Sequence, residues 1–176
     1  MSGTDQQSQF EEVVLPHLDA AYNLARWLAG NEHDAEDIVQ EAFLRAFRFV
    51  GGFRGGNSRS WLLTIVRNTA YTWLRKNHSA PVVRLDEDEL AEIPDPAALG
   101  GDVALLRSAD AGQLRAALEQ LPVEFREALV LRELEGLSYK EIAEVADVPI
   151  GTVMSRLARA RKQLQELLQP KGGVEP

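Results

Sequence analysis

The 176-residue chain has no cysteine, which excludes disulfides, thiolate zinc sites, iron–sulfur clusters and cysteine nucleophiles. It has no apolar run long enough to cross a membrane, and its start lacks the basic end and apolar stretch of a secretory signal. We therefore expect a cytoplasmic protein without membrane insertion. Alternation of apolar and polar residues, the mark of strands, is also nearly absent.

Enzyme motifs are lacking too. The sequence has no Walker loop and no G-x-S-x-G motif, and its three histidines, His17, His33 and His78, are scattered. The acids around His33 lack the H-E-x-x-H spacing of a zinc site, and acids at a helix start are expected from the helix dipole. We predict no enzymatic activity, no cofactor and no metal.

Charge is unevenly distributed along this chain of net charge -8. Residues 1–43 hold nine acids and one base, residues 44–76 hold seven bases and no acid, and residues 150–176 have a net charge of +3. Two basic segments in an acidic chain suggest that the basic segments bind nucleic acid while an acidic surface faces another partner. Solvated helix faces are the alternative that charge alone leaves open.

Apolar residues recur at spacings of three and four over about 10–78 and again over 114–168, which predicts an all-α protein. Between these blocks lie three prolines, two glycines and the acidic run DEDE at 86–89, a composition that cannot bury much surface. We therefore expect two small helical domains, at 1–78 and 111–170, joined by a flexible acidic linker at 79–110 and followed by a tail at 171–176.

The first block predicts a three-helix unit. One helix is expected over about 10–30, a second from a cap at Asn31 or Asp34 to about 49, and a third from a cap at Ser58 to about 76. A basic glycine-rich loop precedes the third helix and consists of Phe53, Arg54, Gly55, Gly56 and Asn57. A flexible basic loop of this kind is typical of a binding site.

The second block predicts a helix-turn-helix. Helices are expected over about 113–119 and from Pro122 to Gly136. Ser138 and Glu141 then form a capping box that opens a short helix, and a turn at 147–149 leads into a long helix over about 150–168.

The long helix has a small, basic face opposite its apolar stripe. Small residues let a helix enter the major groove, arginines donate in pairs to guanine edges or phosphates, and a helix start can hold a phosphate. The predicted duplex-binding residues are Gly151, Thr152, Ser155, Arg156, Arg159 and Lys162. A solvated basic helix end is the alternative.

The third helix of the first block interleaves arginine with an aromatic residue on one face, and this face adjoins the glycine-rich loop. Such a surface can stack an unpaired base and neutralise its backbone. The predicted contacts are the five loop residues together with Thr64, Arg67, Asn68, Tyr71 and Arg75. Trp61 and Trp73 are interpreted as core.

The second helix of the first block places an exposed leucine among polar residues. Helical periodicity turns Asp37, Gln40, Glu41 and Leu44 outward. An exposed leucine in this setting suggests a protein interface. A solvated acidic face with one stray leucine is an equally open reading.

Together these segments resemble a known family. The stretches DAEDIVQEAF at 34–43, WLLTIVRN at 61–68, Leu-Pro at 121–122, LSYKEIA at 137–143 and GTVMSRLARAR at 151–161 are similar, in this order and spacing, to the sigma-70 family, in its extracytoplasmic-function group. The resemblance covers nearly the whole chain.

The resemblance implies an alternative sigma factor that binds core RNA polymerase. Asp37, Gln40, Glu41 and Leu44 would contact the beta-prime clamp helices, and the beta flap is a further expected contact of the protein. The glycine-rich loop and third helix would melt the minus-ten element and capture an unpaired base, and the helix-turn-helix would read the minus-thirty-five element as duplex. An anti-sigma factor would control the protein. The competing reading is a helix-turn-helix regulator that acts without polymerase.

Overall fold

The computed structural model describes residues 3–77 and 110–169, and within them it contains helices and no strand. The all-α prediction is confirmed for this part of the chain. The expected linker, except Asp110, and the tail lie outside the described residues. None of the described helices is long and apolar enough to cross a membrane.

The N-terminal domain has more helical segments than the three predicted. Its elements are α1 (Gly3–Val14), the 3₁₀ turn η1 (Leu15–His17), α2 (Leu18–Ala29), α3 (Glu32–Phe49), the 3₁₀ turn η2 (Val50–Gly52) and α4 (Ser58–Asn77). The prediction of one continuous helix over 10–30 is wrong, because the chain tightens into η1 at Pro16. Proline lacks an amide hydrogen and its ring clashes with the preceding turn, so an α-helix cannot pass through it undisturbed.

Helix caps in this domain partly follow the sequence. The Asn31 side chain accepts a hydrogen bond from the Asp34 amide at 2.8 Å, which confirms Asn31 as the cap of α3. The cap of α4 is Asn57, whose Oδ1 accepts from the Ser60 amide at 3.0 Å, and not Ser58 as predicted. The Ser58 hydroxyl instead lies 2.9 Å from His17 Nε2 and ties the start of α4 to η1.

The C-terminal domain has α7 (Ala111–Gln120), α8 (Val123–Leu129), a π-helical segment η4 (Val130–Leu134), α9 (Tyr139–Ala146) and α10 (Ile150–Leu168). The Asp110 side chain, at the end of the expected linker, caps α7 by accepting from the Gln113 amide at 2.7 Å. Beyond η4, Gly136 turns the chain with φ of 69°.

The predicted helix-turn-helix is present as α9 and α10. Both hydrogen bonds of the Ser138–Glu141 capping box are formed at the start of α9. Asp147 ends α9 in the left-handed conformation with φ of 56°, and Pro149 precedes α10 without a side-chain cap. The buried stripe of α10 contains Val153, Leu157, Ala160 and Leu164, as periodicity predicts.

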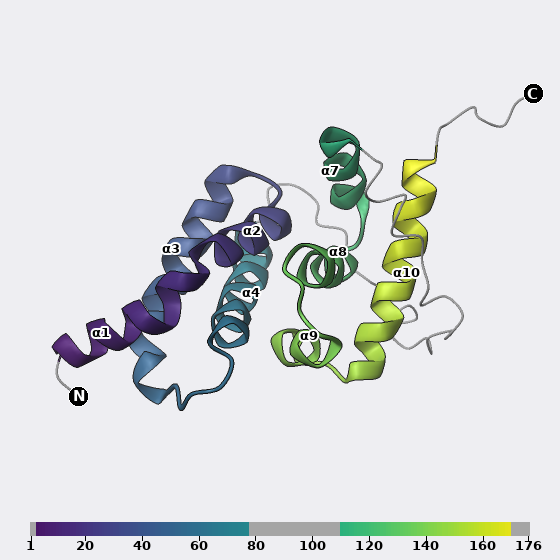
Figure 1. The fold of residues 1–176 in the computed structure, drawn as a ribbon. Coiled ribbons are helices and arrows are strands. Elements are labelled where there is room, and N and C mark those ends of the chain that lie inside the picture. The colour runs from purple at the N-terminus through teal and green to yellow at the C-terminus, as the bar shows by residue number, and fades with distance from the viewer. Residues whose placement is uncertain (1–2, 78–109, 170–176) are drawn as a thin grey trace, which may run out of the picture.

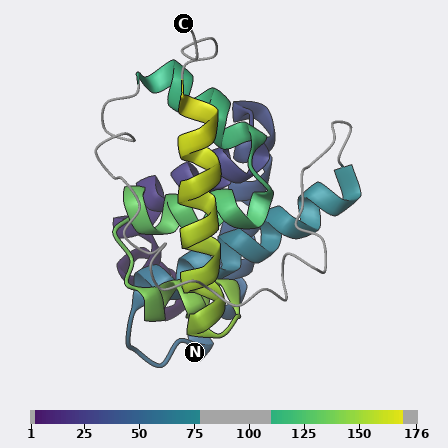
Figure 2. The ribbon, with the colours of Figure 1, turned by 90° about the vertical axis from the view of Figure 1, so that its right-hand side faces the viewer.

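The two domains pack directly against each other (Figure 1). Helix α4 contacts α9, and α2 contacts α8, so the face of α4 that points away from its own domain meets the C-terminal domain. In Figure 1, α8 and α9 lie between α10 and the N-terminal domain, and in Figure 2 α10 runs vertically in front of the other helices. Helix α4 is therefore covered on one side by its own domain and on another by the C-terminal domain.

Candidate nucleic-acid and protein interfaces

Helix α3 presents the outward face that the sequence predicts. Leu44 is 68% exposed, and Gln40 and Glu41 are exposed beside it, whereas Asp37 is half-buried. Glu41 forms an ion pair with Arg45 one turn later, at 3.3 Å. A large apolar side chain held in solvent among polar groups is suited to burial against another protein.

Two phenylalanines extend this face beyond the prediction. Phe49 is 58% exposed and Phe47 is 39% exposed, both near the end of α3. Phe47 also packs edge-on against Phe10 of α1, with ring centroids 5.5 Å apart. Periodicity did not single out either residue, although Phe47 lies three residues after Leu44 and therefore on nearly the same side of the helix.

The glycine-rich loop is largely open to solvent. Arg54, Gly55, Gly56 and Asn57 are exposed, while Phe53 is half-buried against Trp61 with ring centroids 5.3 Å apart. Gly55 and Gly56 have φ values of 95° and 90°, which residues with a side chain rarely adopt. The loop is anchored at one end by an aromatic contact and at the other by the cap of α4.

The predicted open face of α4 is only partly open. Asn68 and Arg75 are exposed and Thr64 is half-buried. Tyr71, however, is only 4% exposed, so the expectation that it faces solvent is wrong for this arrangement of the domains. Trp61 and Trp73 pack against the core as predicted.

An ion pair with the C-terminal domain explains the burial of this face. Arg67 Nε of α4 lies 2.7 Å from Glu127 Oε2 of α8, and the two side chains are 16% and 1% exposed. The Arg67 guanidinium also lies over the Tyr71 ring, 3.9 Å from its centroid. Tyr71 is thus enclosed between Arg67 and the C-terminal domain.

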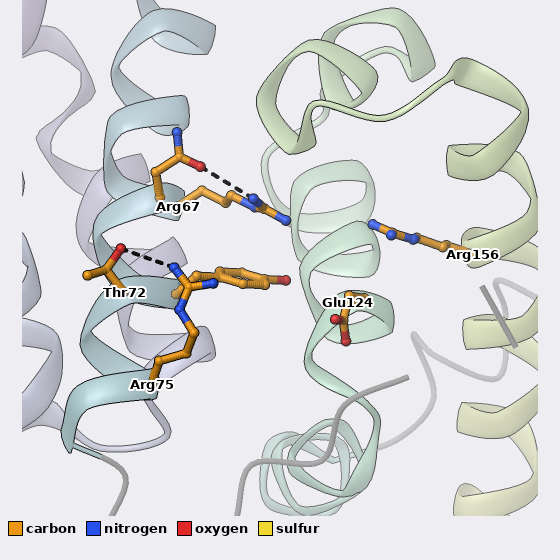
Figure 3. A pocket seen from close by; sticks show the side chains of 7 residues that line it. Arg67, Thr72, Arg75, Glu124 and Arg156 are labelled. Carbon is orange, nitrogen blue, oxygen red and sulfur yellow. Dashed lines mark hydrogen bonds between the residues drawn. The ribbon is translucent and has the colours of Figure 1, made fainter. Parts of the chain in front are cut away.

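A cleft of about 370 Å³ lies between the domains at this point (Figure 3). It is lined by Arg67, Asn68, Tyr71, Thr72 and Arg75 of α4, Glu124 of α8 and Arg156 of α10. In Figure 3, Arg67 and Arg156 extend toward α8 from opposite sides. Predicted single-strand contacts and one predicted duplex contact therefore converge on the same acidic stretch of α8.

Burial governs the protonation of the groups in this cleft. It raises the pKa of Glu127, and the charges of Arg67 and Arg156 offset only part of that rise. Burial also raises the pKa of the Tyr71 hydroxyl well above its ordinary value, with the charge of Glu127 adding to the effect. For Arg67 burial acts to lower the pKa, but Glu127 and Tyr71 together raise it.

A second group of interdomain contacts joins the glycine-rich loop and the first turn of α4 to α9 and the segment before it. The Asn57 amide nitrogen donates to Glu141 Oε2, and Arg59 Nη1 donates to the Glu135 carbonyl at 2.9 Å. Farther along the boundary, Arg126 of α8 donates to the Leu28 carbonyl of α2 at 3.4 Å. The interdomain contacts of Glu127, Glu141 and Arg126 were not predicted, because nothing in the sequence distinguishes a charged residue that packs against another domain from one that faces solvent.

Helix α10 presents most of its predicted duplex-binding residues at least partly to solvent. Lys162 is exposed, and the half-buried members are Gly151, Thr152, Arg156 and Arg159. Ser155 is 6% exposed and its neighbour Ala158 is 4% exposed, so the expectation of an open small-residue face is wrong at these positions. Periodicity within α10 could not reveal what packs on that side.

The acidic start of α3 brings His33, Asp34 and Asp37 close together, with His33 Nε2 3.7 Å from Asp37 Oδ2. The His33 side chain is 84% exposed, and Asp34 also participates in the cap of α3. These interactions account for the cluster as an exposed helix start.

Comparisons with known proteins give the same two-part division. Residues 13–80 match the family Sigma-70 region 2, and residues 111–164 match the family Sigma-70, region 4. The chain is 41% identical over 162 residues to the ECF RNA polymerase sigma factor SigE of Mycolicibacterium smegmatis, covering 90% of this chain and 61% of that protein. It is 38% identical over 172 residues to the RNA polymerase sigma-H factor of Pseudomonas aeruginosa, covering 92% of this chain and 86% of that protein.

Two solved structures are also similar. The sigma factor RpoE of Bartonella quintana, in complex with the anti-sigma factor NepR, is 31% identical with a TM-score of 0.70, covering 92% of this chain and 98% of that one. CnrH, in complex with the cytosolic domain of CnrY, is 25% identical with a TM-score of 0.65, covering 94% and 91%. The chain therefore belongs to the sigma-70 family, among the ECF RNA polymerase sigma factors.

Proposed function

We propose that this ECF sigma factor binds core RNA polymerase, directs it to specific promoters and helps to open the DNA for initiation. The observation that carries the proposal is the presence of sigma regions 2 and 4, in that order, in one chain. A helix-turn-helix regulator acting without polymerase is not favoured, because it leaves the acid-free basic segment at 44–76 without a role. As a transcription initiation factor the protein works in the cytoplasm and needs no catalytic residue, cofactor or metal.

Polymerase binding is assigned to the outer face of α3. Leu44 supplies apolar surface, and Asp37, Gln40 and Glu41 supply polar contacts to the beta-prime clamp helices. The exposure of Leu44 in the middle of this polar set supports the assignment. The beta flap of core polymerase is proposed as a further contact of this protein.

Recognition of the minus-ten element is assigned to the N-terminal domain at 1–78. The exposed loop and the exposed residues of α4 offer donors to a single strand, and the Tyr71 ring offers a stacking surface once it is uncovered. Arg156, Arg159 and Lys162 of α10 are assigned to the minus-thirty-five duplex, with Gly151, Thr152 and Ser155 at the helix start.

An anti-sigma factor is the proposed regulatory partner. One of the similar solved structures is the sigma factor RpoE with the anti-sigma factor NepR, and the other is CnrH with the cytosolic domain of CnrY. They cover nearly the whole of this chain, so the surfaces that such partners use have counterparts here.

Transcription with core polymerase tests the function itself. The full chain and sigma-free core polymerase are mixed with a promoter library, and the transcripts are sequenced. Promoter-specific start sites are expected, and random initiation equal to that of core polymerase alone would contradict the proposal.

A selected promoter then tests the site. Tyr71→Ala should reduce open-complex formation on duplex DNA, whereas Tyr71→Phe keeps the stacking ring and should retain it. A pre-melted bubble should largely rescue Tyr71→Ala, since it removes the unpairing cost of about a few kcal/mol per flipped base. Wild-type behaviour of Tyr71→Ala on both templates would show that Tyr71 is a packing residue only.

A further inference from the structure

The cleft of Figure 3 carries an excess of positive charge. Three arginines and one acid line it, namely Arg67, Arg75, Arg156 and Glu124. Arg67 is paired with Glu127 at 2.7 Å. Neither Arg75 nor Arg156 forms an ion pair within the part of the chain that the structure describes. Two guanidinium groups in the cleft are therefore available to bind an anion.

These two arginines have unused hydrogen-bonding capacity. Arg156 Nε is buried and lacks a hydrogen-bond partner within residues 3–77 and 110–169. An unpaired buried donor is costly, so an acceptor placed here would stabilise the arrangement. Arg75 is exposed and donates to Thr72 Oγ1 at 3.5 Å, which is long for a hydrogen bond. In Figure 3, Arg75 and Arg156 lie on opposite sides of Glu124, so a ligand that contacts both arginines spans the cleft.

The size of the cleft and its arginines together suggest a phosphorylated small molecule. Guanidinium groups bind phosphate oxygens through paired, charge-assisted hydrogen bonds. The volume of about 370 Å³ lies within the range of about 300–1,000 Å³ that small-molecule sites occupy. A phosphate ion alone would leave most of this volume unfilled. The ligand that fits therefore combines phosphate with a larger organic part.

Glu124 indicates the nature of that organic part. It is 5% exposed and lines the cleft among the arginines. A carboxylate repels phosphate, but it accepts hydrogen bonds from ribose hydroxyls, as in dinucleotide-binding sites. Its two oxygens offer several lone pairs, so it can accept from a sugar and from a protein group at once. Asn68 and Thr72 add an amide and a hydroxyl on the α4 wall. Phosphate-binding and ribose-binding groups in one cleft are the combination that a ribonucleotide requires.

We propose that this cleft is an effector site for a ribonucleoside di- or triphosphate, with Arg75 and Arg156 holding the phosphates and Glu124 accepting from the ribose hydroxyls. The inference goes beyond the proposed function, because binding needs neither polymerase nor promoter. A DNA strand lacks the 2′-hydroxyl and would bring phosphates against Glu124, so the site is selective for ribonucleotides. The bound nucleotide contacts α4 of one domain and both α8 and α10 of the other.

Calorimetric titration of the full chain tests the site without polymerase or DNA. ATP, GTP, CTP and UTP are titrated separately, because the polar groups of the α4 wall suit more than one base. At least one of them should saturate a single site at submillimolar concentration. Its 2′-deoxy form should bind about fivefold more weakly and inorganic triphosphate about tenfold more weakly, since each lacks hydrogen bonds that the ribonucleotide makes. Failure of all four nucleotides to saturate at millimolar concentration would overturn the inference.

Substitutions then locate binding in the cleft. Arg75→Gln and Arg156→Gln each remove one guanidinium and should weaken nucleotide binding about tenfold. Arg48→Gln is the matched control, since it makes the same charge change at an exposed position of α3 outside the cleft, and it should alter affinity less than about twofold. Glu124→Gln removes the carboxylate charge and should reduce the preference for the ribonucleotide over its 2′-deoxy form. Melting temperatures without ligand show whether each variant folds.

Two further results would contradict the inference. Equal losses of affinity in Arg48→Gln and Arg156→Gln would show a general attraction between the anion and the protein, and no site in the cleft. Equal binding of the ribonucleotide and its 2′-deoxy form would show that Glu124 does not recognise ribose, which overturns the ribonucleotide class. Promoter-specific transcription is measured separately, so failure of this inference is distinguishable from failure of the proposed function.

Discussion

Leu44 offers a quantitative test of the polymerase-binding face. The perturbation is Leu44→Ala, which removes most of an apolar side chain that is 68% exposed in the free protein. Full burial of a leucine contributes about 1.5–3 kcal/mol, so burial of the exposed two-thirds is worth about 1–2 kcal/mol. Affinity for core polymerase should therefore fall by about 5- to 30-fold.

The assay is equilibrium titration of the dye-labelled full chain with core polymerase, with Leu15→Ala as the control. Leu15 is 47% exposed in η1 of the same domain, so the control removes the same group from a different element. Leu44→Asp should lose more affinity than Leu44→Ala, because it also brings a carboxylate into the interface.

Stability should be nearly unchanged in these α3 variants. Surface substitutions of this kind usually alter the free energy of unfolding by less than about 0.5 kcal/mol. A loss of binding with the wild-type melting temperature would therefore locate the effect in the interface. Equal affinities of Leu44→Ala and wild type for core polymerase would refute the assignment of α3.

Three further predictions concern the C-terminal domain. Arg159→Ala should weaken binding to minus-thirty-five duplex by about 1–3 kcal/mol if it reads a base edge, and an unchanged footprint there would contradict this. The hydrogen bond from the Ser138 amide lowers the pKa of Glu141 below its ordinary value of 4.5. The charged Glu141 side chain therefore stabilises the fold above pH 4.5, and this stabilisation is lost as the pH falls through the lowered pKa. The free energy of unfolding of Glu141→Gln, measured with urea, should therefore be lower than that of wild type at neutral pH and equal to it in acid. Asp147→Ala should lower the free energy of unfolding by about 1 kcal/mol because of its positive φ, whereas Asp147→Gly should be tolerated.

Local signals predicted the C-terminal helices well. The capping box at Ser138 and the helix break at Pro122 depend only on residues close in sequence, so both can be recognised from the sequence alone. The start of α1 was missed because residues 3–9 are almost all polar and show no apolar period. This first part of α1 is instead held against α3 by Gln6, whose side chain donates to the Phe47 carbonyl at 2.7 Å.

The faces of α4 could not be assigned from its own periodicity. A helical projection shows which residues share a side, but it does not show how many sides are covered. One signal was available: Leu63 lies on the side that was expected to be open, and it is fully buried. Glu127 gave no such signal, because its burial depends on a surface from a distant part of the chain.

Desolvation sets a limit on how tightly the two domains can hold each other. The geometry of the Arg67–Glu127 pair is close to ideal at 2.7 Å, yet burial raises the pKa of Glu127 despite its cationic neighbours. The environment therefore penalises the charge of Glu127 more than those neighbours stabilise it. A pair of this kind fixes the docking geometry but adds little net affinity, since both charges regain water when the domains part. A well-packed apolar contact at the same position would hold the domains together without a comparable gain of hydration when they separate.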